Sequence, residues 1–293
     1  MFKTRLMDCA ARVQLHLDSV LAPKDGQAGD LPVVQAMRYA SHGGKRLRAF
    51  LVLESARLHG IPTEQAIWPA AAIEAMHAYS LVHDDLPCMD DDDMRRGQPT
   101  VHVKWDYPTA VLAGDALQSL AFELTSHPQV SAKAEVRAEL ALELARAAGA
   151  QGMVLGQALD MAAESSDTPL TLEQITELQD GKTGALFGWS AMAGARMAKA
   201  DTTPWADYAK GLGLAFQIWD DVLDIEGDAE VVGKAVGKDS DAGKATFVSL
   251  LGIDTAKARA NELIDQSCAA LDPFGAEADI LKDVARFVIT RNK

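Results

Sequence analysis

The stretch that decides the fold is residues 64–83, EQAIWPAAAIEAMHAYSLVH, followed directly by residues 84–97, DDLPCMDDDDMRRG. The first segment is rich in alanine, which favours helices and disfavours strands. It therefore predicts a long helix that carries an acidic cluster at its C-terminal end.

Helical periodicity recurs on both sides of this segment. Leu6, Val13 and Leu17 lie on one stripe of a first helix, and Thr171-x-x-Gln174 reads as a capping box at a later helix start. We predict further helices at residues 33–42, 46–58, 109–126, 132–148, 153–163, 172–198, 204–225, 247–271 and 276–289. No sustained alternating pattern predicts a sheet, and no linker separates the helices. The sequence therefore predicts an all-α fold with one domain over residues 1–293.

Composition excludes several classes of protein. The 293 residues carry a formal net charge of −14, so duplex nucleic acid is an unsuitable partner. An acidic ligand can still bind through divalent cations. Three widely spaced cysteines predict reduced thiols in a cytoplasmic protein. Residues 1–21 have no continuous apolar core and no uncharged apolar stretch of about 18 residues occurs, so we expect neither a signal peptide nor a membrane span.

Two acidic clusters carry the chemistry. Residues 84–93 hold six aspartates in ten residues, and the simplest explanation is a bound divalent cation, although a solvated acidic face is the common alternative. The second cluster is Asp220-Asp221-Val222-Leu223-Asp224, in which Asp220 and Asp224 face one side of a helix. It follows an apolar segment, where carboxylates are costly unless they meet a positive charge. Two facing clusters with Mg²⁺ between them would bind a diphosphate.

With these clusters, the sequence resembles the short-chain trans-prenyl diphosphate synthases, closest to the bacterial farnesyl type. The motifs follow the order of that family from Gly43 to Lys293: GGKRLR at 43–48, His77, the first aspartate-rich motif with Arg95-Arg96, Gly181-Lys182-Thr183, Phe216-Gln217, the second aspartate-rich motif, Lys234 and Lys244. Ala49 departs from the family, which usually has proline there. The resemblance implies helices around a central cavity and a homodimer. Pro87-Cys88 lengthens the first motif, and we infer a local bulge that brings Asp90 level with Asp84.

The resemblance also implies the roles of individual residues. About three Mg²⁺ ions, or Mn²⁺ as the alternative, are held by Asp84, Asp90, Asp220 and Asp224, and Asp85 and Asp221 orient them. The allylic diphosphate contacts Arg95, Lys182 and Lys234, with Thr183, Gln217 and Lys244 nearby. Isopentenyl diphosphate is bound by Lys45, Arg48, His77 and Arg96. The allylic C–O bond then breaks, and the double bond of isopentenyl diphosphate attacks the carbocation in a dry cavity.

Product length depends on the side chains before the first motif. In this family they form the floor of the pocket, and here they are Tyr79 and Ser80. A bulky tyrosine would stop elongation at fifteen carbons, so we expect farnesyl diphosphate; geranylgeranyl diphosphate is the alternative. A non-catalytic subunit is a second alternative, but such subunits usually lose the aspartate motifs. A terpene cyclase or hydrolase is a third, but it would not need cations for a second diphosphate.

Overall fold

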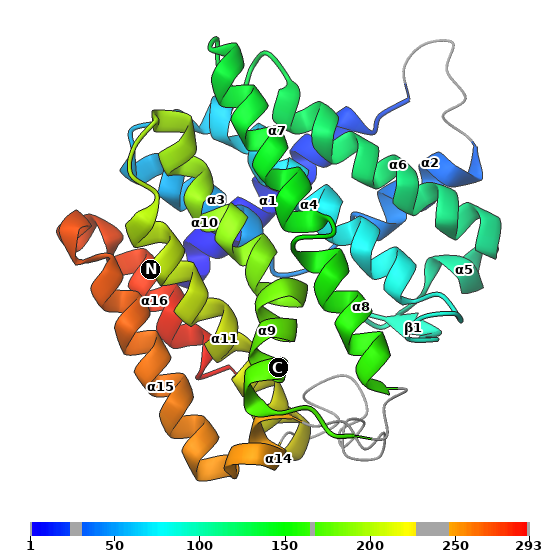
Figure 1. Cartoon of the computed structure of the whole chain (residues 1–293). Coiled ribbons are helices and arrows are strands. Elements are labelled where there is room, and N and C mark those ends of the chain that lie inside the picture. The colour runs from blue at the N-terminus through cyan, green and yellow to red at the C-terminus, as the bar shows by residue number, and fades with distance from the viewer. Residues whose placement is uncertain (1, 24–30, 165–167, 227–245, 292–293) are drawn as a thin grey trace. The chain divides into compact units, whose positions relative to one another are not determined.

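The computed structural model describes residues 2–23, 31–164, 168–226 and 246–291, which form two compact units (Figure 1). The first unit is mainly Lys3–Leu142 with Arg196–Lys199, and the second is mainly Glu143–Ala195 with Ala200–Lys293. The all-α prediction is confirmed, because nearly every regular element in the described residues is a helix. Each unit has its own packing, so the single domain and its central cavity stay predictions.

The first unit contains most of the N-terminal half of the chain. Its elements are α1 (Phe2–Val20), α2 (Pro32–Ala40), α3 (Leu47–Leu58), α4 (Thr63–Asp84), β1 (Met94–Arg95), β2 (Gln98–Pro99), α5 (Val101–Lys104), α6 (Tyr107–Ser126) and the start of α7 (Ala134–Ala148). The small hairpin of β1 and β2 and the short helix α5 were not predicted. Both lie beside the acidic cluster, where the periodic helical pattern stops.

Helices α4 and α6 lie side by side, and α3 packs on α4 (Figure 1). Gly114 permits the close approach of α4 and α6, because a Cβ at this position would lie 2.1 Å from Nε2 of His83. Large apolar side chains on these helices, such as Phe50, Ile73 and Leu117, are fully buried. The end of α4, where the acidic cluster begins, is therefore held on a well-packed scaffold.

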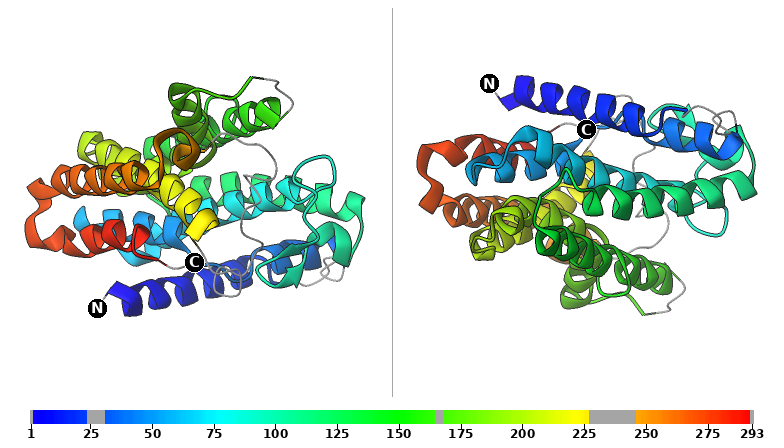
Figure 2. Two further views of the ribbon diagram at one scale, coloured as in Figure 1. Left: turned by 90° about the horizontal axis from the view of Figure 1, so that it is seen from below. Right: turned by 90° about the horizontal axis from the view of Figure 1, so that it is seen from above.

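The second unit contains the end of α7 and α8 (Met153–Glu164), α9 (Leu172–Gln179), a π-helical turn η1 (Asp180–Gly184), α10 (Ala185–Ala198), α11 (Thr203–Glu226), α14 (Phe247–Leu251), α15 (Ile253–Ala270), the 3₁₀ segment η2 (Asp272–Ala278) and α16 (Asp279–Val288). Helices α11 and α15 pack along each other, as the further views in Figure 2 also show. The aromatic core includes Trp189, Trp205 and Tyr208, which are fully buried.

Three predicted helices are interrupted. Helix 172–198 is broken by the π turn at Asp180–Gly184, and helix 247–271 is broken at Gly252, whose φ of +77° suits glycine. The last predicted helix begins as the 3₁₀ segment before α16. The capping box at Thr171 is confirmed, since its side chain and that of Gln174 bond each other's backbone N–H groups.

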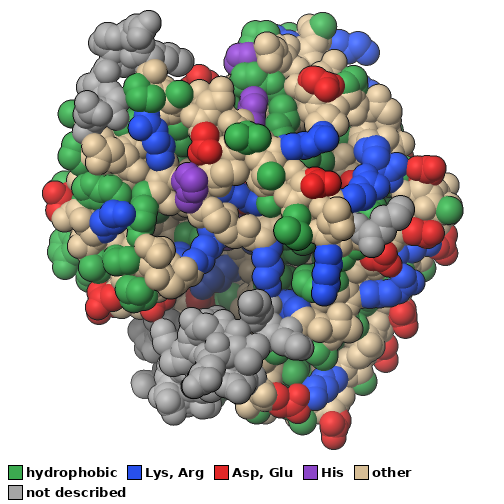
Figure 3. All heavy atoms as spheres, turned by 180° about the vertical axis from the view of Figure 1, so that it is seen from behind, with side chains coloured by type: hydrophobic (Ala, Val, Ile, Leu, Met, Phe, Trp, Pro, Cys, Tyr) green, Lys and Arg blue, Asp and Glu red, His purple; other side chains and the backbone are tan. Residues whose placement is uncertain are grey.

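The remaining expectations concern the surface and the cysteines. In the part of the chain that the structure describes, no helix combines the length and the apolar composition needed to cross a bilayer. Cys9, Cys88 and Cys268 are free thiols, as predicted. On the face in Figure 3, Lys and Arg side chains lie among Asp and Glu side chains. Cationic groups are therefore available to an anionic ligand although the net charge is −14.

Candidate active site

The first aspartate-rich motif begins where α4 ends. Helix α4 stops at Asp84, and Pro87 follows in a turn. A local bulge was inferred here, and the chain forms a turn in which the N–H of Asp90 donates to the carbonyl of Asp84 at 2.8 Å. This bond places Asp90 next to Asp84 along the backbone, the pairing that the resemblance implied.

Asp85 has a different environment from Asp84 and Asp90. It is only 3% exposed, and one of its carboxylate oxygens accepts from both Nε and Nη2 of Arg95 at 2.6 Å. Burial raises the pKa of Asp85, and the charge and hydrogen bond of Arg95 act in the opposite direction. Asp85 therefore fixes the guanidinium of Arg95, while Asp84 and Asp90 remain nearer the solvent.

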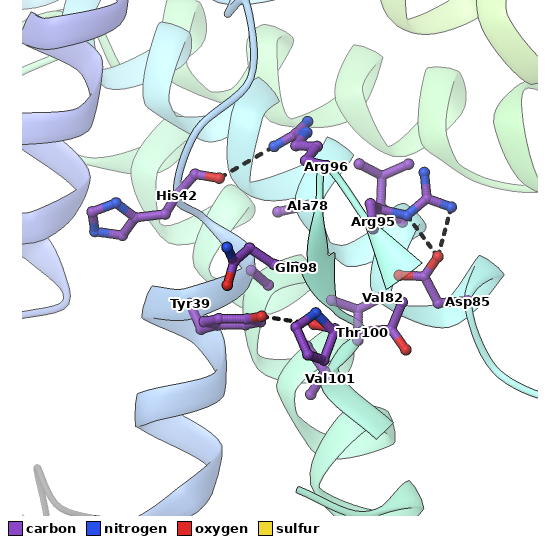
Figure 4. A pocket seen from close by; sticks show the side chains of 13 residues that line it. Tyr39, His42, Ala78, Val82, Asp85, Arg95, Arg96, Gln98, Thr100 and Val101 are labelled. Carbon is purple, nitrogen blue, oxygen red and sulfur yellow. Dashed lines mark hydrogen bonds and ion pairs between the residues drawn. The ribbon is translucent and has the colours of Figure 1, made fainter. Parts of the chain in front are cut away.

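Arg95 and Arg96 are carried by the β1–β2 hairpin. The guanidinium of Arg96 lies against Gly44, where a Cβ would come within 2.9 Å of it, and donates to the carbonyl of His42 at 3.3 Å. The hairpin thus places Arg96 against the GGKRLR loop, beside Lys45. Figure 4 shows Arg95 with Asp85 and Arg96 with His42.

A concentration of positive charge surrounds His77 on α4. Its pKa is well below 6.5 because burial penalises the imidazolium and because Arg48 and Arg96, followed by further arginines, repel it. Burial also lowers the pKa of Arg48 to about 10. The structure therefore brings together His77, Arg48 and Arg96, three of the four residues predicted to bind isopentenyl diphosphate. The fourth, Lys45, is exposed on the adjoining loop.

Sequence reasoning missed the buried ion pair beneath this loop. Arg46 donates to Glu74 of α4 at 3.1 Å and to Gln14 of α1 at 2.7 Å, and it also donates to the carbonyl of Ser41. The second carboxylate oxygen of Glu74 accepts from the N–H of Ala49 at 3.0 Å. A glutamate inside an apolar run was the available signal, since a buried charge requires a partner.

The bond from the N–H of Ala49 to Glu74 gives a role to the alanine that stands where the family usually has proline. Proline has no N–H and could not donate to Glu74. In this chain the start of α3 is tied to Glu74 by a hydrogen bond that the usual family residue cannot form.

The predicted chain-length residues lie on α4. Tyr79 is half-buried, and its ring packs edge-on against His83 with ring centroids 5.2 Å apart. Burial, then the charges of Asp84 and Asp115, raise the pKa of Tyr79, so its hydroxyl lies near the first acidic motif. Ser80 is buried, and its hydroxyl donates to the carbonyl of His77 at 2.9 Å.

In the second unit, Lys182 is positioned by the close packing of two backbone segments. Gly156 on α8 lies against the π turn, since a Cβ there would come within 2.0 Å of the backbone nitrogen of Lys182. Lys182 forms an ion pair of 2.5 Å with Asp160, one turn further along α8. Thr183 is buried in the same turn, and Gln217 of α11 donates to the side chain of Gln179 at 2.6 Å.

Two residues of α8 were missed as members of this group. Asp160 holds Lys182, and Gln157 has a buried side-chain amide whose nitrogen and oxygen have no hydrogen-bond partner in the described residues. Buried amides are normally bonded, so Gln157 is suited to meet a bound ligand or water. The spacing Gln157-x-x-Asp160, which puts both on one helical face, was the available signal.

The second aspartate-rich motif lies near the end of α11. Asp220 accepts from Arg291 at 2.8 Å, and the Arg291 guanidinium also lies 3.8 Å from the centre of the Phe216 ring. Asp221 accepts from the N–H of Phe247 at 2.7 Å, a bond at the start of α14. Arg291 was missed, because 71 residues separate it from Asp220.

The donor sets fit a hard cation that also binds substrate oxygens. No group of three or more His, Cys, Asp or Glu side chains in the described ranges forms a complete metal site. Mg²⁺ is commonly held by one or two carboxylates together with substrate phosphates, so Asp84 with Asp90, and Asp220 with Asp224, are the candidate protein donors. Lys234 and Lys244, both predicted to bind substrate, lie outside the described residues.

Comparison with known proteins identifies the family. The family model for polyprenyl synthetase matches residues 32–282. A farnesyl diphosphate synthase of Escherichia coli strain K12 is 43% identical over 100% of this chain and 99% of its own length. A geranylgeranyl diphosphate synthase of Cyanophora paradoxa is 39% identical over 89% of this chain and 88% of its own. The crystal structure of an FPP/GFPP synthase from Zymomonas mobilis is 44% identical, with a TM-score of 0.89 and 98% of both chains covered.

This chain belongs to the polyprenyl synthetase family. The predicted family and the predicted prenyltransferase class are therefore confirmed.

Proposed function

We propose that this chain is a farnesyl diphosphate synthase, which joins isopentenyl diphosphate head to tail with dimethylallyl and then geranyl diphosphate. The observation that carries the proposal is full-length identity of 43% to a farnesyl diphosphate synthase, and both acidic motifs and their neighbouring cations are present in this sequence. The bulky Tyr79, next to the first acidic motif, supports the fifteen-carbon product over the longer ones.

The residues of each unit support distinct roles. Mg²⁺, or Mn²⁺, held by Asp84, Asp90, Asp220 and Asp224 would supply positive charge to the leaving diphosphate, and about three ions are proposed. Arg95 binds the allylic diphosphate in an orientation fixed by Asp85. Lys182 has the same role in an orientation fixed by Asp160. These pairs keep each cation in place before substrate arrives, which reduces the entropy lost on binding.

The second diphosphate is bound without metal. Lys45, Arg48 and Arg96 supply donors to isopentenyl diphosphate. Burial and then the nearby arginines lower the pKa of His77, and a bound diphosphate would offset the repulsion from those arginines. Arg46 and Glu74 hold the loop that carries Lys45 and leads into α3, where Arg48 lies. The apolar side chains of the helices exclude water from the carbocation, and the departing diphosphate is suited to accept the final proton.

We further propose a homodimer. Tyr107, Val111 and Leu112 on α6 are large apolar side chains with exposed fractions of 58%, 41% and 56%. An exposed apolar patch of this kind is typical of a protein interface. Light scattering after size-exclusion chromatography should give twice the chain mass, and Leu112→Asp should shift it to the monomer. A monomeric wild-type protein would exclude this part of the proposal.

Product analysis tests the reaction. Purified protein is incubated with Mg²⁺, isopentenyl diphosphate and dimethylallyl diphosphate, and the products are identified by mass spectrometry. We expect a dominant fifteen-carbon diphosphate, and no product with excess EDTA or in Asp84→Asn. A dominant twenty-carbon product would keep the reaction and exclude the assignment of Tyr79 as the floor. No condensation by folded protein would exclude the enzyme.

A further inference from the structure

The β1–β2 hairpin carries Arg95 and Arg96 but is too short to be stable without contacts to other elements. Its strands have two residues each, with Met94 opposite Pro99 and Arg95 opposite Gln98. Arg96 and Gly97 form the turn, with φ values of +53° and +74°. Even a full-length isolated hairpin is marginally stable in water, so the position of this one depends on contacts with other elements.

Close packing does not supply those contacts on one side of the hairpin. A cavity of about 280 Å³ lies there, lined by Ala78, Leu81 and Val82 of α4 and by Val101, Tyr39 and hairpin residues (Figure 4). Side chains that border a cavity lose the contacts that would otherwise fix them. Discrete bonds must therefore set where the hairpin lies.

Among the residues that the structure describes, three such bonds connect the hairpin to other elements. Arg95 bonds Asp85 of α4 at 2.6 Å, and Arg96 bonds the carbonyl of His42 at 3.3 Å, which is long for a hydrogen bond. The third runs from the hydroxyl of Tyr39 on α2 to the carbonyl of Pro99 on β2, at 2.7 Å (Figure 4). It is the one strong bond of the three that does not involve an arginine needed for substrate.

The ring of Tyr39 is itself held in place. The Lys104 ammonium lies 3.8 Å above its centre, and Trp105 packs edge-on with ring centroids 5.3 Å apart. Lys104 ends α5, the helix that follows the hairpin directly. Tyr39 therefore contacts both β2 and the segment after it, and its hydroxyl has little freedom to leave Pro99.

We propose that Tyr39 is a positioning residue that holds the hairpin, and through it the Arg96 guanidinium, in register for the diphosphate of isopentenyl diphosphate. This inference rests on the proposed function of Arg96. Arg95 is less dependent on Tyr39, because Asp85 fixes it independently. In this role Tyr39 acts through the hairpin, so its effect is on affinity at the Arg96 side.

Tyr39→Phe tests the proposal, since it removes only the hydroxyl. A lost hydrogen bond of about 1 kcal/mol corresponds to about a fivefold change, so we expect the KM for isopentenyl diphosphate to rise roughly three- to tenfold. The KM for geranyl diphosphate and kcat should change less. In an Arg96→Met background, Tyr39→Phe should add almost nothing to that KM, because the group it positions is gone.

Tyr208→Phe is the matched control. Tyr208 is fully buried, whereas Tyr39 is partly exposed, but the Tyr208 hydroxyl likewise donates to a backbone carbonyl, that of Leu281 at 2.9 Å. This variant should lower the melting temperature and leave the KM for isopentenyl diphosphate unchanged. Equal KM values for Tyr39→Phe and wild type, or an equal rise in both variants, would overturn the positioning role.

A binding measurement separates this inference from the proposed function. Calorimetric titration of the holoprotein with isopentenyl diphosphate, without allylic substrate, requires no turnover. Weaker binding to Tyr39→Phe than to wild type supports the positioning role even if condensation fails. Condensation with equal binding by both proteins excludes the positioning role and keeps the enzyme.

Discussion

The buried Arg46–Glu74 pair leads to a quantitative prediction about stability. Glu74 on α4 and Glu54 on α3 are almost equally buried, with exposed fractions of 3% and 4%. Their partners differ. The Arg46 side chain is 3% exposed, whereas Arg5 and Arg57, which bind Glu54 at 2.5 and 2.9 Å, are 36% and 34% exposed. Glu74→Gln and Glu54→Gln therefore compare the same substitution with a buried and with a solvated partner.

The expected magnitudes follow from what each substitution leaves behind. Glu74→Gln leaves the Arg46 charge without its counter-ion in the interior, where breaking a buried pair costs about 3–5 kcal/mol. The new amide can still accept from Ala49, so the loss is mainly the ion pair. Glu54→Gln leaves arginines that water can reach, and such pairs contribute about 1 kcal/mol or less.

Urea unfolding followed by circular dichroism measures both values, with the slope checked for a single transition. In a thermal scan, Glu74→Gln should lower the melting temperature by roughly 6 °C or more. Because Arg46 anchors the loop that carries Lys45 and Arg48, the folded fraction of this variant should also have a higher KM for isopentenyl diphosphate. Equal losses in the two variants would refute the claim that the partner's burial sets the cost.

Four further changes test other parts of the structure. Tyr79→Ala should shift the product from fifteen toward twenty carbons by mass spectrometry; an unchanged product means that the ring only packs on His83. Gly156→Ala should destabilise the protein by at least about 2 kcal/mol and lower kcat, because its Cβ would displace the π turn that carries Lys182. Ala49→Pro should lower the urea midpoint, because losing the bond to the buried Glu74 costs more than the stiffer unfolded chain gains. Burial, then His127, lowers the pKa of His16 below 6.5, so the folded state binds fewer protons than the unfolded state and the free energy of unfolding should fall as pH drops from about 7.5 to about 5. His16→Phe should make that fall smaller, and an equal fall in both proteins would contradict the assignment.

The helices could be predicted from the sequence because their signals are local. Alanine and leucine content and periodicity place α4 and α11 within two residues of their ends. The break at Asp180–Gly184 could not be predicted in this way, since it depends on Gly156 packing against the backbone of Lys182. A glycine's local preference does not show which backbone will approach it.

The same distinction holds for the site. Clusters of aspartates and arginines can be recognised in the sequence, whereas the distant residues that pair with them cannot. Glu74 lies 28 residues from Arg46, and Tyr39 lies 60 residues from Pro99. Pro87 indicated a local departure from helical geometry but not its form, which is a turn after α4. In that turn the N–H of Asp90 bonds the carbonyl of Asp84, because the end of a helix leaves its last carbonyls free to accept.

The two units fix the direction of a cationic side chain in similar ways. A diphosphate site needs cations that are fixed in direction yet still attractive to a new anion. Asp85 with Arg95 in the first unit and Asp160 with Lys182 in the second each pair one carboxylate with one cation at 2.6 and 2.5 Å. In the first unit, the buried Asp85 pairs with the cation, and the more exposed Asp84 and Asp90 are the proposed metal ligands. The large excess of aspartate in these motifs is therefore divided by burial into residues that orient cations and residues that can bind Mg²⁺.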